Sequence, residues 1–92
     1  MVKYMYISYA KWASIDSNWD WEPILKQWRV LMEEYGVKLV GRGFPAGMYE
    51  DWVAVYLSDI EPTKFYEFLR KAFRFNGKTV GSTKTTVVVS QD

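Results

Sequence analysis

The chain of 92 residues contains no cysteine and no histidine. Without cysteine it has neither a disulfide framework nor a thiol redox centre. Without either residue it cannot build a triad based on histidine or cysteine, an ordinary zinc site or a histidine-ligated haem. A Mg²⁺ or Ca²⁺ site could use carboxylates alone, but the acidic residues are spread over helix starts and turns without the spacing of a metal loop. We therefore expect no metal and no cofactor.

Long apolar runs and an excess of one charge are also lacking. No stretch approaches the roughly 20 apolar residues of a membrane span, and the first segment, MVKYMYISYAKW, lacks the unbroken apolar run of a signal peptide. The 12 basic and 11 acidic residues give a formal net charge of +1, so no global field attracts nucleic acid or an anionic membrane. We expect a cytoplasmic protein that makes no membrane contact.

Aromatic residues, by contrast, are abundant: they make up 18% of the chain, with 5 Trp, 7 Tyr and 5 Phe. A chain of this length forms one domain, residues 1–92, and buries only roughly 60–65% of the surface that its unfolded form exposes. Tyr and Trp favour places that are apolar on one side and wet on the other. The composition therefore indicates more apolar surface than one subunit can bury.

Two similar tetrapeptides, DWEP at 20–23 and DIEP at 59–62, predict two helix starts. In each, the aspartate (Asp20 or Asp59) is expected to cap the first turn, and proline suits that turn because its missing N–H costs little there. Apolar residues then recur at helical spacing. Gly36 and the Asn76-Gly77 pair are expected to end the two helices.

Four further segments have the composition and alternation of strands: residues 2–9, 37–44, 51–58 and 79–89. The order is βαββαβ, which predicts a ferredoxin-like α+β fold: an antiparallel four-stranded sheet with two helices on one face. With right-handed crossovers, we expect the first and third strands in the centre, parallel to each other, and the two helices running in the same direction. Pro45 and Gly47 predict the turn between the second and third strands.

Alternation along each strand assigns its side chains to two faces. We expect the helices to cover Met5, Ile7, Val37, Leu39, Val53, Val55 and Leu57. The uncovered face would then carry Tyr4, Tyr6, Ser8, Val40, Arg42, Trp52, Ala54 and Tyr56, joined by Lys84, Thr86 and Val88. This predicted face is aromatic and too apolar to be left bare in a soluble monomer. A second copy, a ligand or single-stranded nucleic acid would have to cover it.

The candidate ligand-binding residues are the polar aromatics and the one arginine of that predicted face. They are Tyr4, Tyr6, Arg42, Trp52 and Tyr56, with Trp19 lying across the end of the sheet. Arg42 stands between Gly41 and Gly43, where a guanidinium could clamp a carboxylate with two hydrogen bonds. The alternatives are an edge-strand arginine that contacts solvent or a partner, and a Trp19 that, with Trp12, only closes the core.

A compact βαββαβ chain with an aromatic sheet face resembles the dimeric α+β barrel group, which includes monooxygenase-like and isomerase-like members. The resemblance is one of topology, and segments such as VGRGF and DWVAVYL only fit its strand pattern. It implies a homodimer with a pocket between sheet and helices. It assigns no catalytic residue, because the pocket histidine of some members has no counterpart in this chain.

Three functions follow in order of preference. The first is a homodimeric small-ligand-binding or structural protein. The second is a cofactor-free enzyme, monooxygenase- or isomerase-like, acting on an aromatic or carboxylate metabolite. The third is a single-stranded RNA-binding module, which is disfavoured because the third strand lacks the basic and glycine positions of the usual RNA-recognition signature. The sequence leaves open whether the protein is an enzyme.

Overall fold

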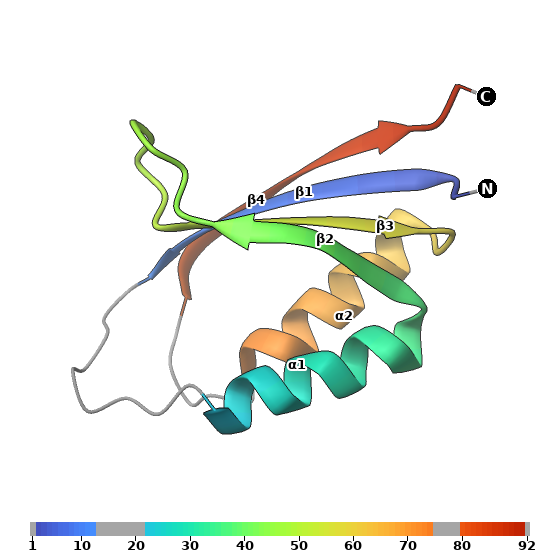
Figure 1. Ribbon diagram of the computed structural model, residues 1–92, viewed down its shortest axis with the longest axis horizontal. Helices are drawn as coiled ribbons and strands as arrows, with labels where there is room; N and C mark the ends of the chain where they lie inside the picture. Colours follow the sequence, from blue (N-terminus) through green and yellow to red (C-terminus); the bar gives the residue numbers. More distant parts are fainter. Residues whose placement is uncertain (1, 13–21, 75–79, 92) are drawn as a thin grey trace.

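The computed structural model describes residues 2–12, 22–74 and 80–91. The elements are, in chain order, β1 (Tyr4–Trp12), α1 (Glu22–Tyr35), β2 (Val37–Gly43), β3 (Trp52–Ser58), α2 (Pro62–Arg74) and β4 (Val80–Val89). The strands form one antiparallel sheet in the order β2-β3-β1-β4, and both helices lie on the same face of it (Figure 1). The predicted ferredoxin-like α+β fold is confirmed.

The directions predicted for two pairs of elements are wrong. The central strands β1 and β3 are antiparallel, with Tyr6 opposite Tyr56. The physical reason is that a right-handed crossover through α1 makes β1 parallel to β2, while β3 follows β2 through a hairpin and must run the other way. Each helix runs back along the strand that precedes it, and because β1 and β3 are antiparallel, α1 and α2 run in opposite directions (Figure 1).

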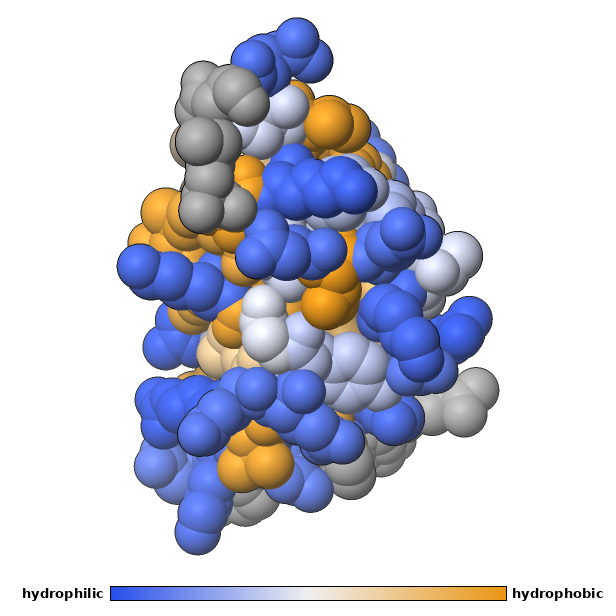
Figure 2. Space-filling model, turned by 90° about the vertical axis from the view of Figure 1, so that its right-hand side faces the viewer, coloured by the Kyte–Doolittle hydropathy of each residue, from blue (hydrophilic) through white to orange (hydrophobic). Residues whose placement is uncertain are grey.

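Each helix turns one apolar stripe toward the sheet, as the helical spacing predicts. The stripe of α1 contributes Trp28, Leu31, Met32 and Tyr35 to the core, and that of α2 contributes Phe65, Phe68, Leu69 and Ala72. The opposite sides are charged, and the helix layer, at the bottom of Figure 2, is mainly hydrophilic. Gly36 ends α1 with a φ of 67°, a conformation that favours glycine. Its predicted role as a helix terminator is confirmed.

The start of α2 differs in detail from the prediction. The carbonyl of Glu61 accepts hydrogen bonds from the N–H groups of Lys64 and Phe65, both at 3.0 Å, so Glu61 is the residue at the cap position and Pro62 opens the helix. Asp59 is therefore not the cap. Its Oδ1 atom accepts a hydrogen bond from the backbone N–H of Lys3 at 2.8 Å and so links the entry of α2 to the start of β1. The predicted cap Asp20 and the predicted stop at Asn76-Gly77 lie outside the described residues.

The assignment of the central strands to the two faces is also wrong. Tyr6, which we expected on the uncovered side, has none of its surface exposed and stacks on Phe65 of α2, with 3.9 Å between ring centroids. Tyr56 lies in the same core. The neighbours of Tyr6 and Tyr56 on this side are small, which lets the phenyl rings of α2 approach the sheet closely. The buried small residues are Ser8, Ala10, Ala54 and Ser58.

On the edge strands the prediction fares better. Val37 and Leu39 of β2 do face the core. Arg42 does not keep to the uncovered side, because a register irregularity between Leu39 and Gly41 brings it opposite Ala54. In β4 the predicted side is right, since Thr86 and Val88 pair with Ile7 and Met5 on the uncovered face.

The uncovered face is nevertheless apolar, because the alternate residues of the central strands are apolar too. It carries Met5, Ile7, Tyr9, Val53, Val55, Leu57 and Val88, all of them partly exposed. We call this set the open face. The loop of residues 44–51, between β2 and β3, rises on the same side of the sheet (Figure 1). The prediction that the aromatic side bearing Tyr6 and Tyr56 is the uncovered one is therefore wrong, because the helices cover it. The sheet still has two apolar sides, and the open one is mainly aliphatic.

Candidate functional site

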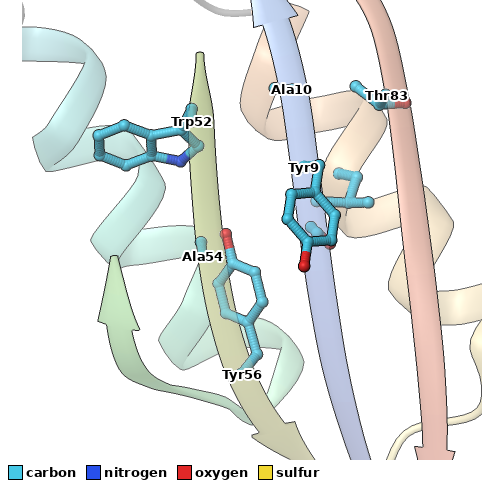
Figure 3. Close-up of a pocket in the computed structure, with 8 residues that line it drawn as sticks. Tyr9, Ala10, Trp52, Ala54, Tyr56 and Thr83 are labelled. Carbon is cyan, nitrogen blue, oxygen red and sulfur yellow. The ribbon is translucent and has the colours of Figure 1, made fainter. Parts of the chain in front are cut away.

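A small hollow lies on the helix-covered side of the sheet, where β1, β3 and β4 face α2. Small side chains, those of Ser8, Ala10 and Ala54, line it on the sheet side. Trp52 and Tyr56 form one wall (Figure 3). The full lining is Ser8, Tyr9, Ala10, Trp52, Ala54, Tyr56, Leu69 and Thr83. The enclosed space is about 10 Å³, on the scale of one water molecule. A larger ligand would need the aromatic wall to move.

Tyr56 provides the polar group of the aromatic wall. Its ring runs along β3 with the hydroxyl toward Trp52 (Figure 3), and the hydroxyl is hydrogen-bonded to Trp28 of α1. Since an indole nitrogen only donates, the tyrosine oxygen is the acceptor and keeps its own proton to donate elsewhere. Burial raises the pKa of Tyr56 well above its usual value. The group is a neutral hydrogen-bond donor and not a base at physiological pH.

Arg42 reaches the same aromatic wall from the edge strand β2. Its guanidinium carbon lies 5.5 Å from the centre of the Trp28 ring and 5.6 Å from that of Trp52. The two indoles contact each other edge-on, with 6.4 Å between ring centroids, and Phe44 packs edge-on against Trp52. Attraction between a cation and the ring faces holds the guanidinium without using its N–H groups.

A β-bulge determines that Arg42 lies on this side. Strict alternation from Val37 and Leu39 would place Gly41 on the core face and Arg42 on the open face. The register shift between Leu39 and Gly41 adds one residue to β2, so that Arg42 pairs with Ala54, a core-facing residue. Bulges commonly redirect a side chain in this way beside functional sites. Only the tertiary pairing reveals the shift.

The structure brings together three of the six predicted site residues: Arg42, Trp52 and Tyr56. Tyr6 lies deeper in the core, where its hydroxyl donates to the carbonyl of Ile60 at 2.6 Å, and Tyr4 packs beside it. Neither lines the hollow. Trp19, like the side chain of Trp12, lies outside the described residues, and its role stays a prediction.

Sequence reasoning missed two features of the hollow. Trp28 was expected only as part of the buried helix stripe, yet it contacts Arg42, Trp52 and Tyr56 together. Ser8 and Ala54 were expected on the uncovered face and not beneath the helices. No local signal marks the hollow, because Ser8, Ala10 and Ala54 become neighbours only when β1 and β3 pair in antiparallel register.

Charged residues also lie beside the open face. Glu50 and Asp51, expected as turn charges, each make an ion pair: Glu50 with Lys84 at 2.9 Å and Asp51 with Lys11 at 3.2 Å. The Lys84 hydrogen bond lowers the pKa of Glu50. The pairs tie the loop to β4 and β1. The loop also displays three exposed apolar side chains, of Phe44, Met48 and Tyr49, with Phe44 82% and Tyr49 73% exposed.

Among residues 2–12, 22–74 and 80–91, no group of three or more acidic side chains is placed to hold a metal ion. Within the same part of the chain, neither helix has the length and apolar character needed to cross a membrane.

No family model matches the sequence, and no curated protein matches it significantly. A search of solved structures finds the same fold in an AsnC family transcriptional regulator from Agrobacterium tumefaciens, with a TM-score of 0.62 and 13% sequence identity. The match covers 98% of this chain and 52% of that one. The chain thus spans about half the length of the regulator, and the likeness is one of fold.

Proposed function

We propose that this chain is a small-ligand-binding module that acts as a homodimer, with the open faces of two sheets packed together. The observation that carries the proposal is the two-sided apolar sheet. Its helices bury one side, while Ile7, Val53 and Val55 lie at the centre of the other side. Monomeric soluble proteins rarely expose a continuous apolar surface of this kind.

The charges beside the open face are compatible with a second copy, because the two lysines there, on β1 and β4, already form ion pairs within their own chain. Lys11 and Lys84 make ion pairs with Asp51 and Glu50 of their own chain, so two open faces can meet without opposing these charges. Apolar centres with a polar rim are typical of homodimer interfaces. The resemblance to the dimeric α+β barrel group supports the same arrangement.

The ligand would enter between the sheet and the helices, at the hollow bounded by Trp52 and Tyr56. Such a site combines apolar walls with a few fixed polar groups, as small-molecule pockets do. The similar structure is described as a transcriptional regulator, and a sensing role in regulation, in the cytoplasm, is the biological setting that we propose. This part of the proposal rests on the fold likeness and on the composition of the hollow.

The other two functions predicted from the sequence gain no specific support. The RNA-binding alternative relied on aromatic side chains of the first and third strands as stacking surfaces. Of these, Tyr6 and Tyr56 lie beneath the helices, where bases cannot stack on them. The enzyme alternative placed its site among Tyr6, Arg42, Trp52 and Tyr56. Burial raises the pKa values of the two phenols and so keeps both of them protonated.

Sedimentation equilibrium of the wild type and two variants tests the dimer. Val55→Lys places a charge in the centre of the open face, and Val30→Lys places the same charge on the exposed side of α1. We expect dimers for the wild type and for Val30→Lys, and folded monomers for Val55→Lys, with circular dichroism as the check on folding. A monomeric wild type at roughly 100 μM, where standard-sized interfaces are normally occupied, would overturn the proposal.

A further inference from the structure

The guanidinium of Arg42 combines three features that rarely occur together on a surface arginine. Both indoles that it contacts, Trp28 and Trp52, also touch Tyr56 or line the hollow. It is exposed to solvent. Of the described residues, no carboxylate lies within ion-pairing distance of it. The faces of the two indole rings therefore hold the guanidinium. No carboxylate of the described residues forms an ion pair with its N–H groups.

The strand around Arg42 carries no competing side chain. Its neighbours Gly41 and Gly43 pair with Val55 and Val53 and so belong to the open-face side of β2, where a Cβ atom built at either glycine meets no other atom within 4 Å. Arg42 is therefore the side chain that this stretch presents on the side of the two tryptophans. The bulge between Leu39 and Gly41 turns the Arg42 side chain toward Trp28 and Trp52, whereas alternation alone would place it on the open face.

We infer that Arg42 is the recognition residue for a carboxylate, and that the ligand of this module is a small carboxylic acid with an aromatic or apolar body. The carboxylate would accept two parallel hydrogen bonds from the guanidinium edge. The body would lie against Trp52, beside the hollow that Trp52 and Tyr56 line. The inference deepens the proposed function and rests on its ligand-binding part alone.

Phenylacetate and phenylacetamide are matched probes for this inference. They share the ring and differ in that the amide has no charge. Titration would be followed by the indole N–H signals of Trp28 and Trp52 in two-dimensional NMR, assigned with Trp28→Phe and Trp52→Phe. We expect phenylacetate to shift both signals in a saturable way and phenylacetamide to bind at least about tenfold more weakly, the loss expected when a charged bidentate pair is replaced by a neutral contact.

The variants separate charge from geometry. Arg42→Gln should weaken phenylacetate binding by about tenfold or more. Arg42→Lys should have an affinity between those of the wild type and Arg42→Gln, because its ammonium keeps the charge but lacks the planar guanidinium that makes two parallel hydrogen bonds. Lys38→Gln removes an exposed cation from the same strand and should change nothing. Equal binding of the two probes, unchanged binding by Arg42→Gln, or no saturable shift with phenylacetate up to roughly 20 mM would overturn the inference.

The outcome is independent of the dimer. A wild type that is monomeric yet binds phenylacetate through Arg42 would refute the homodimer and keep the inference. Binding of both probes alike at Trp52, with the dimer intact, would keep the proposed function and refute the carboxylate specificity.

Discussion

Tyr6 of β1 and Phe65 of α2 stack face to face, with 3.9 Å between ring centroids and 3° between ring planes. Both side chains are fully buried. The contact joins a central strand to the second helix, and the Tyr6 hydroxyl adds a hydrogen bond to the carbonyl of Ile60 just before that helix. The pair lies in the core, on the helix-covered side of the sheet.

Truncation of Phe65 should destabilise the protein far more than removal of the Tyr6 hydroxyl. Phe65→Ala leaves a cavity against the sheet and should cost about 3–5 kcal/mol. Tyr6→Phe keeps the stack and loses one hydrogen bond, at about 1–2 kcal/mol. Urea unfolding followed by circular dichroism gives both free energies. Equal losses for the two variants would show that the stack contributes little.

Alkaline pH should weaken the fold through the buried phenols. Burial raises the pKa of Tyr6 to about 12, above the value of about 10 in an unfolded chain. Below pH 10 the phenol is protonated in both states, and its full contribution to the free energy of unfolding is present. As the pH rises from 10 through 12 this contribution is lost, because the phenol of the unfolded chain releases its proton at a lower pH than that of the folded protein. For Tyr6 alone the loss is about 3 kcal/mol.

The measurement is urea unfolding at several pH values between about 9 and 12. Tyr6→Phe should show a shallower fall in the free energy of unfolding than the wild type. Tyr66→Phe removes an exposed phenol from α2 and serves as the control. If Tyr6→Phe followed the wild-type curve with a constant offset, the raised pKa would not contribute to stability.

The helix end at Gly36 should be sensitive to substitution, unlike a glycine in the strand that follows. Gly36 has a φ of 67°, so Gly36→Ala forces an alanine into a left-handed conformation and should cost about 1 kcal/mol. Gly43→Ala, where an added Cβ meets nothing within 4 Å, should cause no loss. Thermal and urea unfolding of both variants test the contrast, and a stable Gly36→Ala would contradict it.

The ion pair across the open face should be visible in the titration of Glu50. The hydrogen bond from Lys84 holds the pKa of Glu50 below its usual value, so Lys84→Met should move that pKa upward, as seen by carboxyl-detected NMR. Lys64→Met breaks a pair with Glu67 on α2 and should leave Glu50 unchanged. An unshifted Glu50 in Lys84→Met would mean that the pair does not persist in solution.

How far the sequence predicts this protein depends on the kind of pattern. The order of elements, the helix stripes and the stop at Gly36 follow from local spacing and turn chemistry, and the structure confirms them. Of the candidate site, Arg42, Trp52 and Tyr56 were predicted together and do lie together. The reason given for their proximity was wrong, because they share the helix-covered side.

Alternation could not have settled the faces of the central strands. In β1 the two alternate sets are Tyr4, Tyr6, Ser8 and Ala10 on one side and Met5, Ile7 and Tyr9 on the other. Residues of both sets can be buried. The alternation is therefore compatible with two arrangements, one with the helices on the first side of the sheet and one with the helices on the second. The aliphatic set is the more hydrophobic of the two, so hydrophobicity alone favours it as the core although the structure buries the other set.

The sequence by itself determined that the chain forms a βαββαβ sheet with apolar residues on both sides, and that it lacks the residues for thiol or imidazole chemistry. Only the tertiary structure decided which side the helices cover and where Arg42 lies. The physical reason is packing: small residues at positions 8, 10, 54 and 58 make room for the rings of α2, and one bulge in β2 turns an arginine toward two tryptophans. Both depend on the fit between elements that are distant in the chain, and no local pattern records that fit.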